Sequence, residues 1–221
     1  MNMIKSKDRV RDHGEVYTAE REVHAMLGLV QHETERIESR FLEPACGTGN
    51  FILPVLEQKL SIIDKRYRRS QVEFERMTVV AVGSIYGIEL LPDNAETCRQ
   101  RLFDLFNELY TQRYKKRTKD SLRDSIRYVL ERNIVVGDAL SLKTVGNKPE
   151  PITFSEWSLV HGSNIKRRDY AFHELIPNNE PDQGLFADMR LSDMDEPVFT
   201  PKPVKEYPIT HILKLAYATN N

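Results

Sequence analysis

The sequence predicts an α/β fold in which an open, mostly parallel sheet carries helices on both faces. Short apolar runs alternate with longer stretches of helical periodicity, an order typical of parallel strands joined by helical crossovers. An acidic residue closes or follows each of the first three runs: Glu43, Glu89 and Asp138. The carboxyl ends of parallel strands meet at one edge of a sheet, where ligands of such folds bind. We therefore expect these three carboxylates to lie together at a ligand site.

The predicted elements follow from the spacing of apolar residues between Gly, Pro and charged segments. The expected strands are Phe41–Leu42, Ile85–Leu90, Ile134–Val136 and Ile152–Phe154. The expected helices are an amphipathic one from Glu20 to about Glu38, one starting at Phe51, one ending at Val82, one starting at Pro92 and a short one ending near Arg132. A charged stretch from Lys65 to Glu75 is expected to lead into the third of these helices.

The chain is expected to form a single domain over residues 13–221. A length of 221 residues allows one sizeable core. Residues 1–12 are charged and lack apolar periodicity, which predicts a flexible lead-in. The C-terminal third gives a weak signal and is expected to be irregular, above all over about 178–208, where prolines follow a polar passage.

Composition restricts the class of protein more than its function. Lys and Arg number 32 against 33 Asp and Glu, so only a local patch would attract nucleic acid. Cys46 and Cys98 are the only cysteines, and no secretory signal segment precedes them, which predicts a cytoplasmic protein without disulfides. The sequence has no zinc-ligand spacing and no apolar stretch near the roughly 18 residues that cross a bilayer. We expect neither a metal nor a membrane contact.

The most informative stretch is Phe41-Leu42-Glu43-Pro44-Ala45-Cys46-Gly47-Thr48-Gly49-Asn50-Phe51. Its two glycines let the backbone approach a ligand, and Glu43 stands at the strand end. A dinucleotide fingerprint would have a third glycine where Ile52 stands, and the Gly-Lys-Ser/Thr ending of a phosphate-binding loop is absent. An acid here suits a cationic amino acid group better than a pyrophosphate. The alternative is an ordinary tight turn between a strand and a helix.

Residues 43–51 resemble the first motif of amino-methyltransferases, Asp/Glu-Pro-x-x-Gly-x-Gly-x-Phe, at every fixed position. The resemblance is to the adenine-specific (N6) DNA methyltransferases of restriction-modification systems. It implies a Rossmann-like class I methyltransferase fold with S-adenosyl-L-methionine as cofactor. It also implies that a loop holds the methionine part of that cofactor, and the loop residues are Glu43, Pro44, Ala45, Cys46, Gly47, Thr48, Gly49, Asn50 and Phe51.

Two later segments resemble further motifs of the same family. Tyr86-Gly87-Ile88-Glu89-Leu90 looks like the second motif, whose acid accepts hydrogen bonds from both ribose hydroxyls. The segment 133–140 looks like the third, in which Asp138, followed by Ala139, accepts from the exocyclic amine of the cofactor's adenine. The alternatives are a solvated strand end at Glu89 and a plain turn at Asp138.

A segment near the N-terminus also resembles this family. Residues 13–19 are similar to the Gly-Glu-x-Tyr/Phe-Thr-Pro sequence that closes over the methionine part, with Ala19 in place of the Pro. The resemblance implies cofactor contacts by Tyr17 and Thr18. The alternative is that Thr18 merely caps a helix.

The base-binding motif of these enzymes is missing. They carry an Asn/Asp/Ser-Pro-Pro-Tyr/Phe/Trp loop that holds the flipped adenine, and this sequence contains no Pro-Pro pair. In the corresponding place, Ser155 and Trp157 could take over the polar and stacking roles, or Trp157 could pack in the core while Ser155 begins a turn. The chain is then an active enzyme with an unusual loop, one subunit of a split enzyme, or a relative that has lost catalysis.

Expected partners follow from the resemblance and from two basic stretches. Lys115–Lys119 and Lys166–Arg168 are candidate DNA contacts, with ordinary solvated faces as the alternative. A second methyltransferase or specificity subunit is expected because little chain is left for target recognition. The competing functions are a non-catalytic subunit that binds S-adenosylmethionine in a restriction or phage-defence complex, and an RNA or protein methyltransferase.

Overall fold

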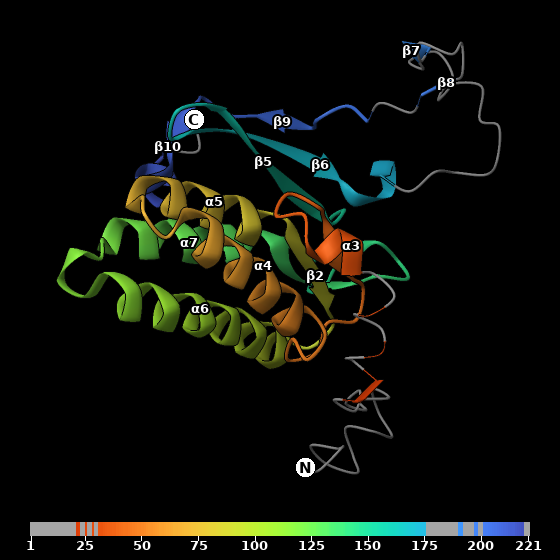
Figure 1. Cartoon of the computed structure of the whole chain (residues 1–221). Helices are drawn as coiled ribbons and strands as arrows, with labels where there is room; N and C mark the ends of the chain where they lie inside the picture. The colour runs from red at the N-terminus through yellow and green to blue at the C-terminus, as the bar shows by residue number, and fades with distance from the viewer. Residues whose placement is uncertain are drawn as a thin grey trace.

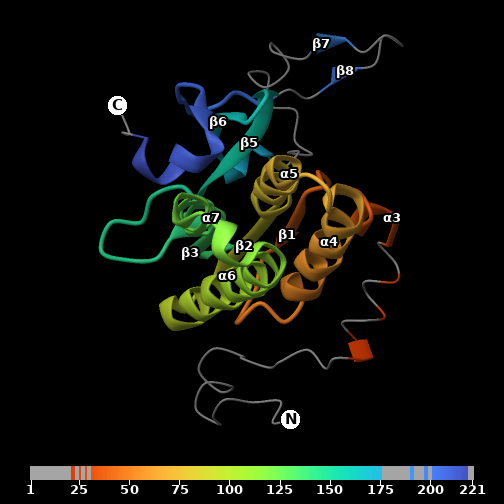
Figure 2. The same cartoon turned by 60° about the vertical axis from the view of Figure 1, so that its left-hand side comes forward.

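The computed structural model describes residues 31–175 and 201–218, together with isolated positions between 21 and 28 and between 190 and 198. Strands alternate with helices as far as β3, and a β-hairpin with short C-terminal pieces follows. Figures 1 and 2 show α4 to α7 gathered into one body, with the hairpin of β5 and β6 alongside it. The described chain is therefore a mixed α/β structure with two sheets of different kinds.

The main sheet has three parallel strands and a short antiparallel one. Its order is β1 (Phe41–Glu43), β2 (Ile85–Glu89), β3 (Ile134–Asp138) and the antiparallel β4 (Lys143–Thr144). Pairing aligns Glu43 with Gly87, and Glu89 with Val136, so the carboxyl ends of the strands share one edge. The first three predicted strands and their parallel direction are confirmed, and β3 continues as far as Asp138.

One layer of helices covers one face of this sheet. Its members are α4 (Ile52–Tyr67), α5 (Gln71–Gly83), α6 (Pro92–Tyr114) and α7 (Asp120–Asn133). Their apolar sides form a single cluster that also takes in Ile85 and Ile134 from the sheet. Cys98, Leu102 and Phe106 of α6 are fully buried in it, as their spacing predicts. Burial of this helical face holds the strands in register.

Helix boundaries differ from the predictions where charged residues occupy exposed helix faces. The charged stretch from Lys65 to Glu75 belongs to the end of α4 and the start of α5. Ser70 caps α5 by accepting a hydrogen bond from the Glu73 N–H, 3.3 Å away. Of the helix predicted up to Glu38, the structure describes α3 (Gln31–Thr34), which ends earlier, and most of the rest lies outside the described residues.

The second face of the sheet is covered by a hairpin in the described part of the chain. β5 (Thr153–His161) pairs antiparallel with β6 (Asn164–Ala171). Tyr86 and Ile88 of β2 form a second apolar cluster with Ile152, Phe154 and Phe172. The described helices therefore cover one face, and helices on the second face stay a prediction. The expectation of an irregular C-terminal third is wrong over 153–171.

Short elements complete the described chain and tie the hairpin to the helical layer. They are η1 (Lys115–Arg117), η2 (Phe172–Leu175), the paired β7 (Arg190–Leu191) and β8 (Pro197–Val198), β9 (Lys205–Glu206), β10 (Thr210–His211) and η4 (Ile212–Tyr217). β9 and β10 pair with β6, while η4 packs against α7. Even α6, with 23 residues, does not combine the length and apolarity that crossing a membrane requires, nor does any other described helix.

Candidate ligand-binding edge of the parallel sheet

The carboxyl edge of the sheet brings together the three acids that the sequence singles out. Glu43 ends β1, Glu89 ends β2 and Asp138 ends β3. The loop after β1 turns across this edge, because the Cys46 N–H donates to the carbonyl of Ile88 at 2.9 Å. The Gly-rich loop and the ends of neighbouring strands therefore form one continuous surface.

Both glycines of the loop adopt backbone conformations that favour glycine, for different reasons. Gly47 has φ +52° and open space where a side chain would stand. Gly49 has φ +88°, and a Cβ there would lie 2.9 Å from the Cys98 sulfur. Gly49 thus lets α6 pack closely under the loop, while the backbone of Gly47 remains open to a ligand. The first residues of α4 continue directly from this turn, with the Leu53 N–H donating to Gly49 at 2.9 Å.

Glu89 joins the Gly-rich loop to the second strand. One carboxylate oxygen accepts from the Gly47 N–H at 2.8 Å, and the other accepts from the Leu91 N–H at 3.0 Å. The side-chain amide of Asn94 adds a third donor at 3.3 Å. Glu89 is only 8% exposed, so its bonds are shielded from competing water. Glu89 therefore holds the Gly-rich loop in place, and its carboxylate can still accept a further hydrogen bond.

The other two acids have different environments. Partial burial raises the pKa of the Glu43 carboxyl, although a hydrogen bond from the Ala45 backbone lowers it in part. Asp138 is half-buried, and its pKa is lowered by hydrogen bonds from the N–H of Leu140, at 2.9 Å, and from the side chain and the N–H of Ser141, the latter at 3.3 Å. Asp138 therefore stays ionised, while the Glu43 carboxylate would gain from a nearby positive charge.

None of the three acids forms an ion pair with a cation in the described part of the chain. Elsewhere in the described chain, acids such as Asp64, Glu75 and Glu156 pair with basic side chains. The described residues therefore leave these carboxylates without a compensating cation, which favours a cationic ligand over a phosphate at this edge.

Comparison with known protein families, with curated proteins and with solved structures found no match for this chain.

Sequence reasoning missed the residue that braces the Gly-rich loop from outside. Arg101 of α6 donates to the carbonyl of Thr48 at 2.6 Å and to the side chain of Asn50 at 2.8 Å. The available signal was its position three residues after Cys98, on the face of α6 that meets the loop. Arg101 orients the loop without touching the open side of Gly47.

Lys59 was also missed, because a lysine inside an amphipathic helix usually points to solvent. Its ammonium group is fully buried and donates to the carbonyl of Ile37 at 3.0 Å, to the carbonyl of Ser39 and to the hydroxyl of Ser84 at 2.6 Å. Desolvation lowers the pKa of Lys59 to about 7. Lys59 anchors the segment that leads into β1, and so sets the position of Glu43.

Cys46 and Cys98 lie beneath the loop and are unsuited to nucleophilic chemistry. Both are free and buried. The hydrogen bond to Cys98 and burial raise the pKa of Cys46 well above its usual range, so it stays a neutral thiol. The described residues also contain no cluster of His, Cys, Asp and Glu side chains that could hold a metal ion.

Ser155 and Trp157 do not join the three acids. Trp157 is buried, its ring N–H donates to Asn133 at 3.1 Å, and it packs against Gly83, at the ends where β3 and β2 begin. Ser155 lies mid-strand and donates to Asp169 at 2.7 Å. Both side chains are therefore engaged away from the carboxyl edge. Tyr17 and Thr18 lie outside the described residues.

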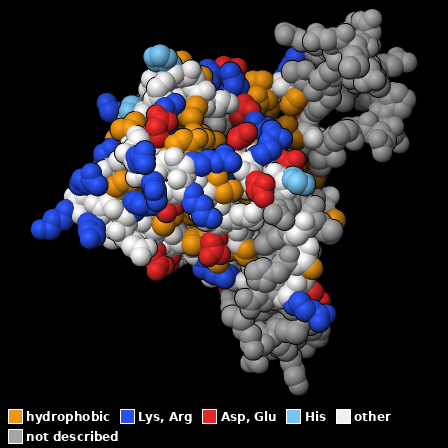
Figure 3. Space-filling model, in the orientation of Figure 1, with side chains coloured by type: hydrophobic (Ala, Val, Ile, Leu, Met, Phe, Trp, Pro, Cys, Tyr) orange, Lys and Arg blue, Asp and Glu red, His pale blue; other side chains and the backbone are white. Residues whose placement is uncertain are grey.

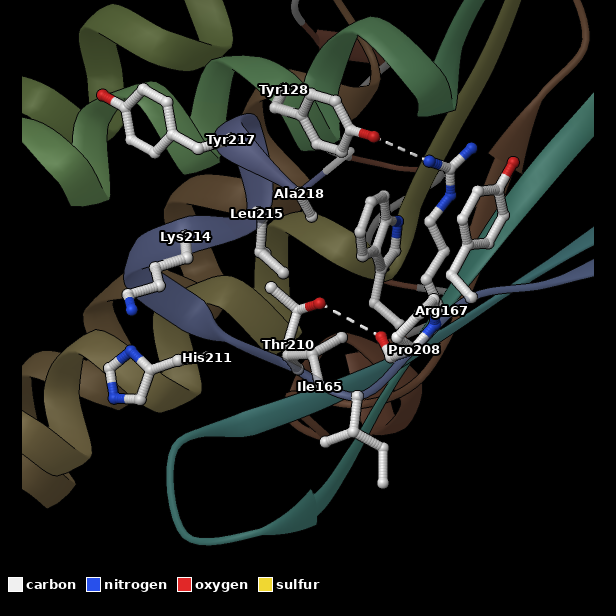
Figure 4. A pocket seen from close by; sticks show the side chains of 13 residues that line it. Tyr128, Ile165, Arg167, Pro208, Thr210, His211, Lys214, Leu215, Tyr217 and Ala218 are labelled. Carbon is white, nitrogen blue, oxygen red and sulfur yellow. Dashed lines mark hydrogen bonds between the residues drawn. The ribbon is translucent and has the colours of Figure 1, made fainter. Parts of the chain in front are cut away.

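The basic stretch Lys166–Arg168 is neutralised by acids of the hairpin region. Lys166 pairs with Glu206 at 2.8 Å, and Arg168 lies 3.5 Å from the same carboxylate. Arg167 pairs with Asp169 at 2.7 Å. Arg167 also lines a pocket of about 430 Å³ and donates to the hydroxyl of Tyr128 at 2.7 Å. Figure 4 shows Arg167 reaching toward that hydroxyl. These cations brace the hairpin and leave little free charge for DNA.

Proposed function

We propose that this chain binds S-adenosyl-L-methionine at the carboxyl edge, which we then call the cofactor edge, and serves as the cofactor-binding part of an adenine-specific (N6) DNA methyltransferase. The observation that carries the proposal is the set of three acids at three successive parallel strand ends, none paired with a described cation. The cofactor has two positive groups, a sulfonium and an ammonium, and one carboxylate, so its net charge complements this edge. The sequence resemblance to the methyltransferase motifs supports the same assignment.

Each acid retains acceptor capacity for a different part of the cofactor. A carboxylate offers about four lone-pair positions, of which described donors use one at Glu43, three at Glu89 and three at Asp138. Glu43 would hold the ammonium group, Glu89 a ribose hydroxyl, and Asp138 the adenine amine. Leu90, 44% exposed, and Leu140, 96% exposed, offer apolar surface beside the last two acids. We assign them to the faces of the adenine ring.

The proposed reaction needs positioning more than acid or base chemistry. The N6 nitrogen of the target adenine attacks the methyl carbon in line with the carbon–sulfur bond, which breaks with its electrons going to sulfur. The product nitrogen then gives a proton to an acceptor, and S-adenosylhomocysteine leaves. Holding the two reactants in line supplies most of the rate enhancement, so a rigid cofactor edge is the main contribution of this chain.

Isothermal titration calorimetry with S-adenosylmethionine and S-adenosylhomocysteine tests the binding step. We expect dissociation constants on the order of micromolar, corresponding to about 8 kcal/mol. Asp138→Asn should weaken binding at least tenfold, because the half-buried Asp138 carboxylate is the proposed acceptor for the adenine amine. Glu108→Gln, an exposed acid on α6, is the matched control and should bind as the unmodified chain does. The absence of binding heat for either ligand on folded protein would overturn the proposal.

The position of β1 at the end of the main sheet favours a split enzyme over a complete one. The main sheet ends at β1, and no described strand pairs with the far side of β1, where Leu42 is 41% exposed. Doubly wound sheets bind ligands where the strand order reverses, so a ligand crevice normally has strands on both sides. The described sheet supplies one side only. The absence of the base-binding motif is consistent with a partner protein that supplies the other side of the crevice.

Transfer of labelled methyl groups to unmethylated DNA distinguishes these possibilities. The split-enzyme form predicts transfer only when a protein encoded beside this chain is added. Transfer by the chain alone would show a complete enzyme with an unusual loop. Cofactor binding without transfer under either condition would favour a non-catalytic subunit, and labelling of RNA or protein would reassign the substrate class.

A further inference from the structure

Exposed cations gather at the end of the helical layer opposite the cofactor edge. They come from the connection between α4 and α5 and from the connection between α6 and α7. Figure 3 shows Lys and Arg side chains crowded on the left of the view, where these helix ends lie in Figure 1. We call this surface the basic end, formed by the exposed Lys65, Arg66, Arg68, Arg69, Lys115, Lys116 and Arg117.

Two contacts hold the two segments of the basic end together. Gln71, at the start of α5, donates to the carbonyl of Arg117 at 2.8 Å. Arg113, at the end of α6, pairs with Asp64, at the end of α4. The seven cations therefore form one surface and not two separate charge runs.

The acids nearest in sequence do not neutralise these cations, because each is paired with another basic residue. The pairs are Asp64 with Arg113, Glu73 with Arg76, Glu75 with Lys119 and Asp120 with Arg123. Within the described residues, none of the seven cations forms an ion pair. Lys119, which the sequence placed with this group, is instead engaged with Glu75 at 2.6 Å. A chain of net charge −1 thus concentrates on one surface seven positive charges that no described acid neutralises.

The backbone of Lys115 supports a role for this surface beyond solubility. Lys115 has φ 50° and ψ −117°, a conformation that glycine adopts without strain and other residues rarely adopt. Such strain persists when something else about the residue is needed, and it gathers at binding sites. Here the lysine keeps a positive charge at the tip of the basic end.

We propose that the basic end binds the phosphate backbone of duplex DNA. Four of the seven cations are arginines, whose planar guanidinium groups match phosphate geometry. A membrane surface would also need exposed apolar residues, and the described segments 64–76 and 113–123 offer only Val72 among large exposed hydrophobic side chains. Phosphate binding here does not depend on the cofactor, whereas the choice of DNA over RNA rests on the proposed function.

The basic end and the cofactor edge lie too far apart to share one phosphate. α6 runs between them with 23 residues, a length of about 34 Å. This is about one helical turn of B-DNA, so a duplex of at least two turns is the appropriate probe. Fluorescence anisotropy with a labelled duplex of about 24 base pairs, titrated between 50 and 200 mM salt, measures both affinity and its salt dependence.

Double lysine-to-glutamine variants on two surfaces distinguish binding at the basic end from a general electrostatic attraction between the chain and DNA. Lys65→Gln combined with Lys116→Gln should reduce the salt slope by about 2 and weaken binding roughly 50-fold at 0.1 M salt, since each phosphate contact contributes about 0.9 to the slope. Lys148→Gln combined with Lys214→Gln removes two exposed lysines elsewhere and should change affinity less than about twofold. Equal losses in the two double variants, or no salt-dependent binding by the unmodified chain, would refute the proposal.

Lys115→Gly tests whether a loss of DNA affinity could result from misfolding. It relieves the strained conformation, so the thermal midpoint should stay level or rise by a few degrees while DNA affinity falls roughly tenfold. Unchanged affinity in this variant would contradict the assignment of Lys115. Tighter binding to duplex RNA, or to vesicles containing anionic lipid, would overturn the choice of DNA. S-adenosylmethionine binding should be unchanged in every basic-end variant, so failure here is distinguishable from failure of the proposed cofactor site.

Discussion

Glu89→Gln is the sharpest test of the cofactor edge, because it keeps the shape of the side chain and removes one acceptor. In the present structure each carboxylate oxygen has its own donors: Gly47 on one side, Leu91 and Asn94 on the other. A glutamine amide would keep its oxygen toward the pair of donors. Its NH2 group would then face the Gly47 N–H, and two donors would oppose each other.

The magnitude follows from the burial of this contact. Leaving a buried backbone donor without an acceptor costs about 1–3 kcal/mol, and Glu89 is 8% exposed. We expect Glu89→Gln to lower the free energy of unfolding by about 1–3 kcal/mol. Because the same bond fixes the Gly-rich loop, cofactor affinity should fall roughly 10- to 100-fold, at about 1.4 kcal/mol per factor of ten.

Urea unfolding and calorimetric titration on the same preparations provide the two measurements. Asp138→Asn is the comparison variant: Asp138 is only half-buried, so water can reach the N–H donors that the substitution leaves unpaired, and the unfolding midpoint should change less than in Glu89→Gln while cofactor binding falls. A Glu89→Gln protein that binds S-adenosylmethionine as tightly as the unmodified chain would show that Glu89 holds the fold only. Unchanged stability would show that the Gly47 contact is not formed in solution.

Four further predictions address other parts of the molecule. Because burial lowers the pKa of Lys59 to about 7 from the ordinary 10.5, the unfolded chain binds more protons between these values. The free energy of unfolding should then rise with pH across that range, by at most about 1.4 kcal/mol per unit, and Lys59→Met should abolish the slope in urea titrations. The pKa of Glu43 is raised, so affinity for a cationic cofactor should fall as the pH is lowered toward it, a dependence that calorimetry should no longer find in Glu43→Gln. Arg101→Ala should speed hydrogen exchange at the loop amides 47–50 and weaken cofactor binding several-fold, and normal exchange would contradict its bracing role. Trp157→Phe should cost about 1 kcal/mol of stability in urea unfolding through the lost bond to Asn133 and leave cofactor affinity unchanged, whereas weakened binding would restore Trp157 to the site.

The parallel sheet and its acidic edge could be predicted because local signals agree with the fold there. Short apolar runs, helical periodicity and the Gly-rich turn all specify the same strand–helix alternation. Once the strands are parallel, the position of Glu43, Glu89 and Asp138 on one edge follows from topology. No similar rule predicts Arg101 or Lys59, because their contacts join segments that are 20 or more residues apart.

The hairpin escaped prediction because its second strand is polar. β6 carries Lys166, Arg167, Arg168 and Asp169 in succession, a composition typical of an exposed loop. In the structure these charges are satisfied across strands, with Ser155 bonded to Asp169 and Arg167 bonded to both. Such cross-strand compensation is invisible until the pairing is known.

The charge distribution suggests how a chain with nearly balanced composition could act on DNA. The acids of the cofactor edge and the cations of the basic end lie about 34 Å apart along α6. Screening in physiological salt acts over about 8 Å, so phosphates at the basic end are not repelled by the distant acids. If the chain acts as proposed, a phosphate close to the cofactor edge would be repelled, and the net positive charge of bound S-adenosylmethionine would reduce that repulsion. Under that proposal, DNA would be held first at the basic end, and the target base would approach an edge whose charge the cofactor has neutralised.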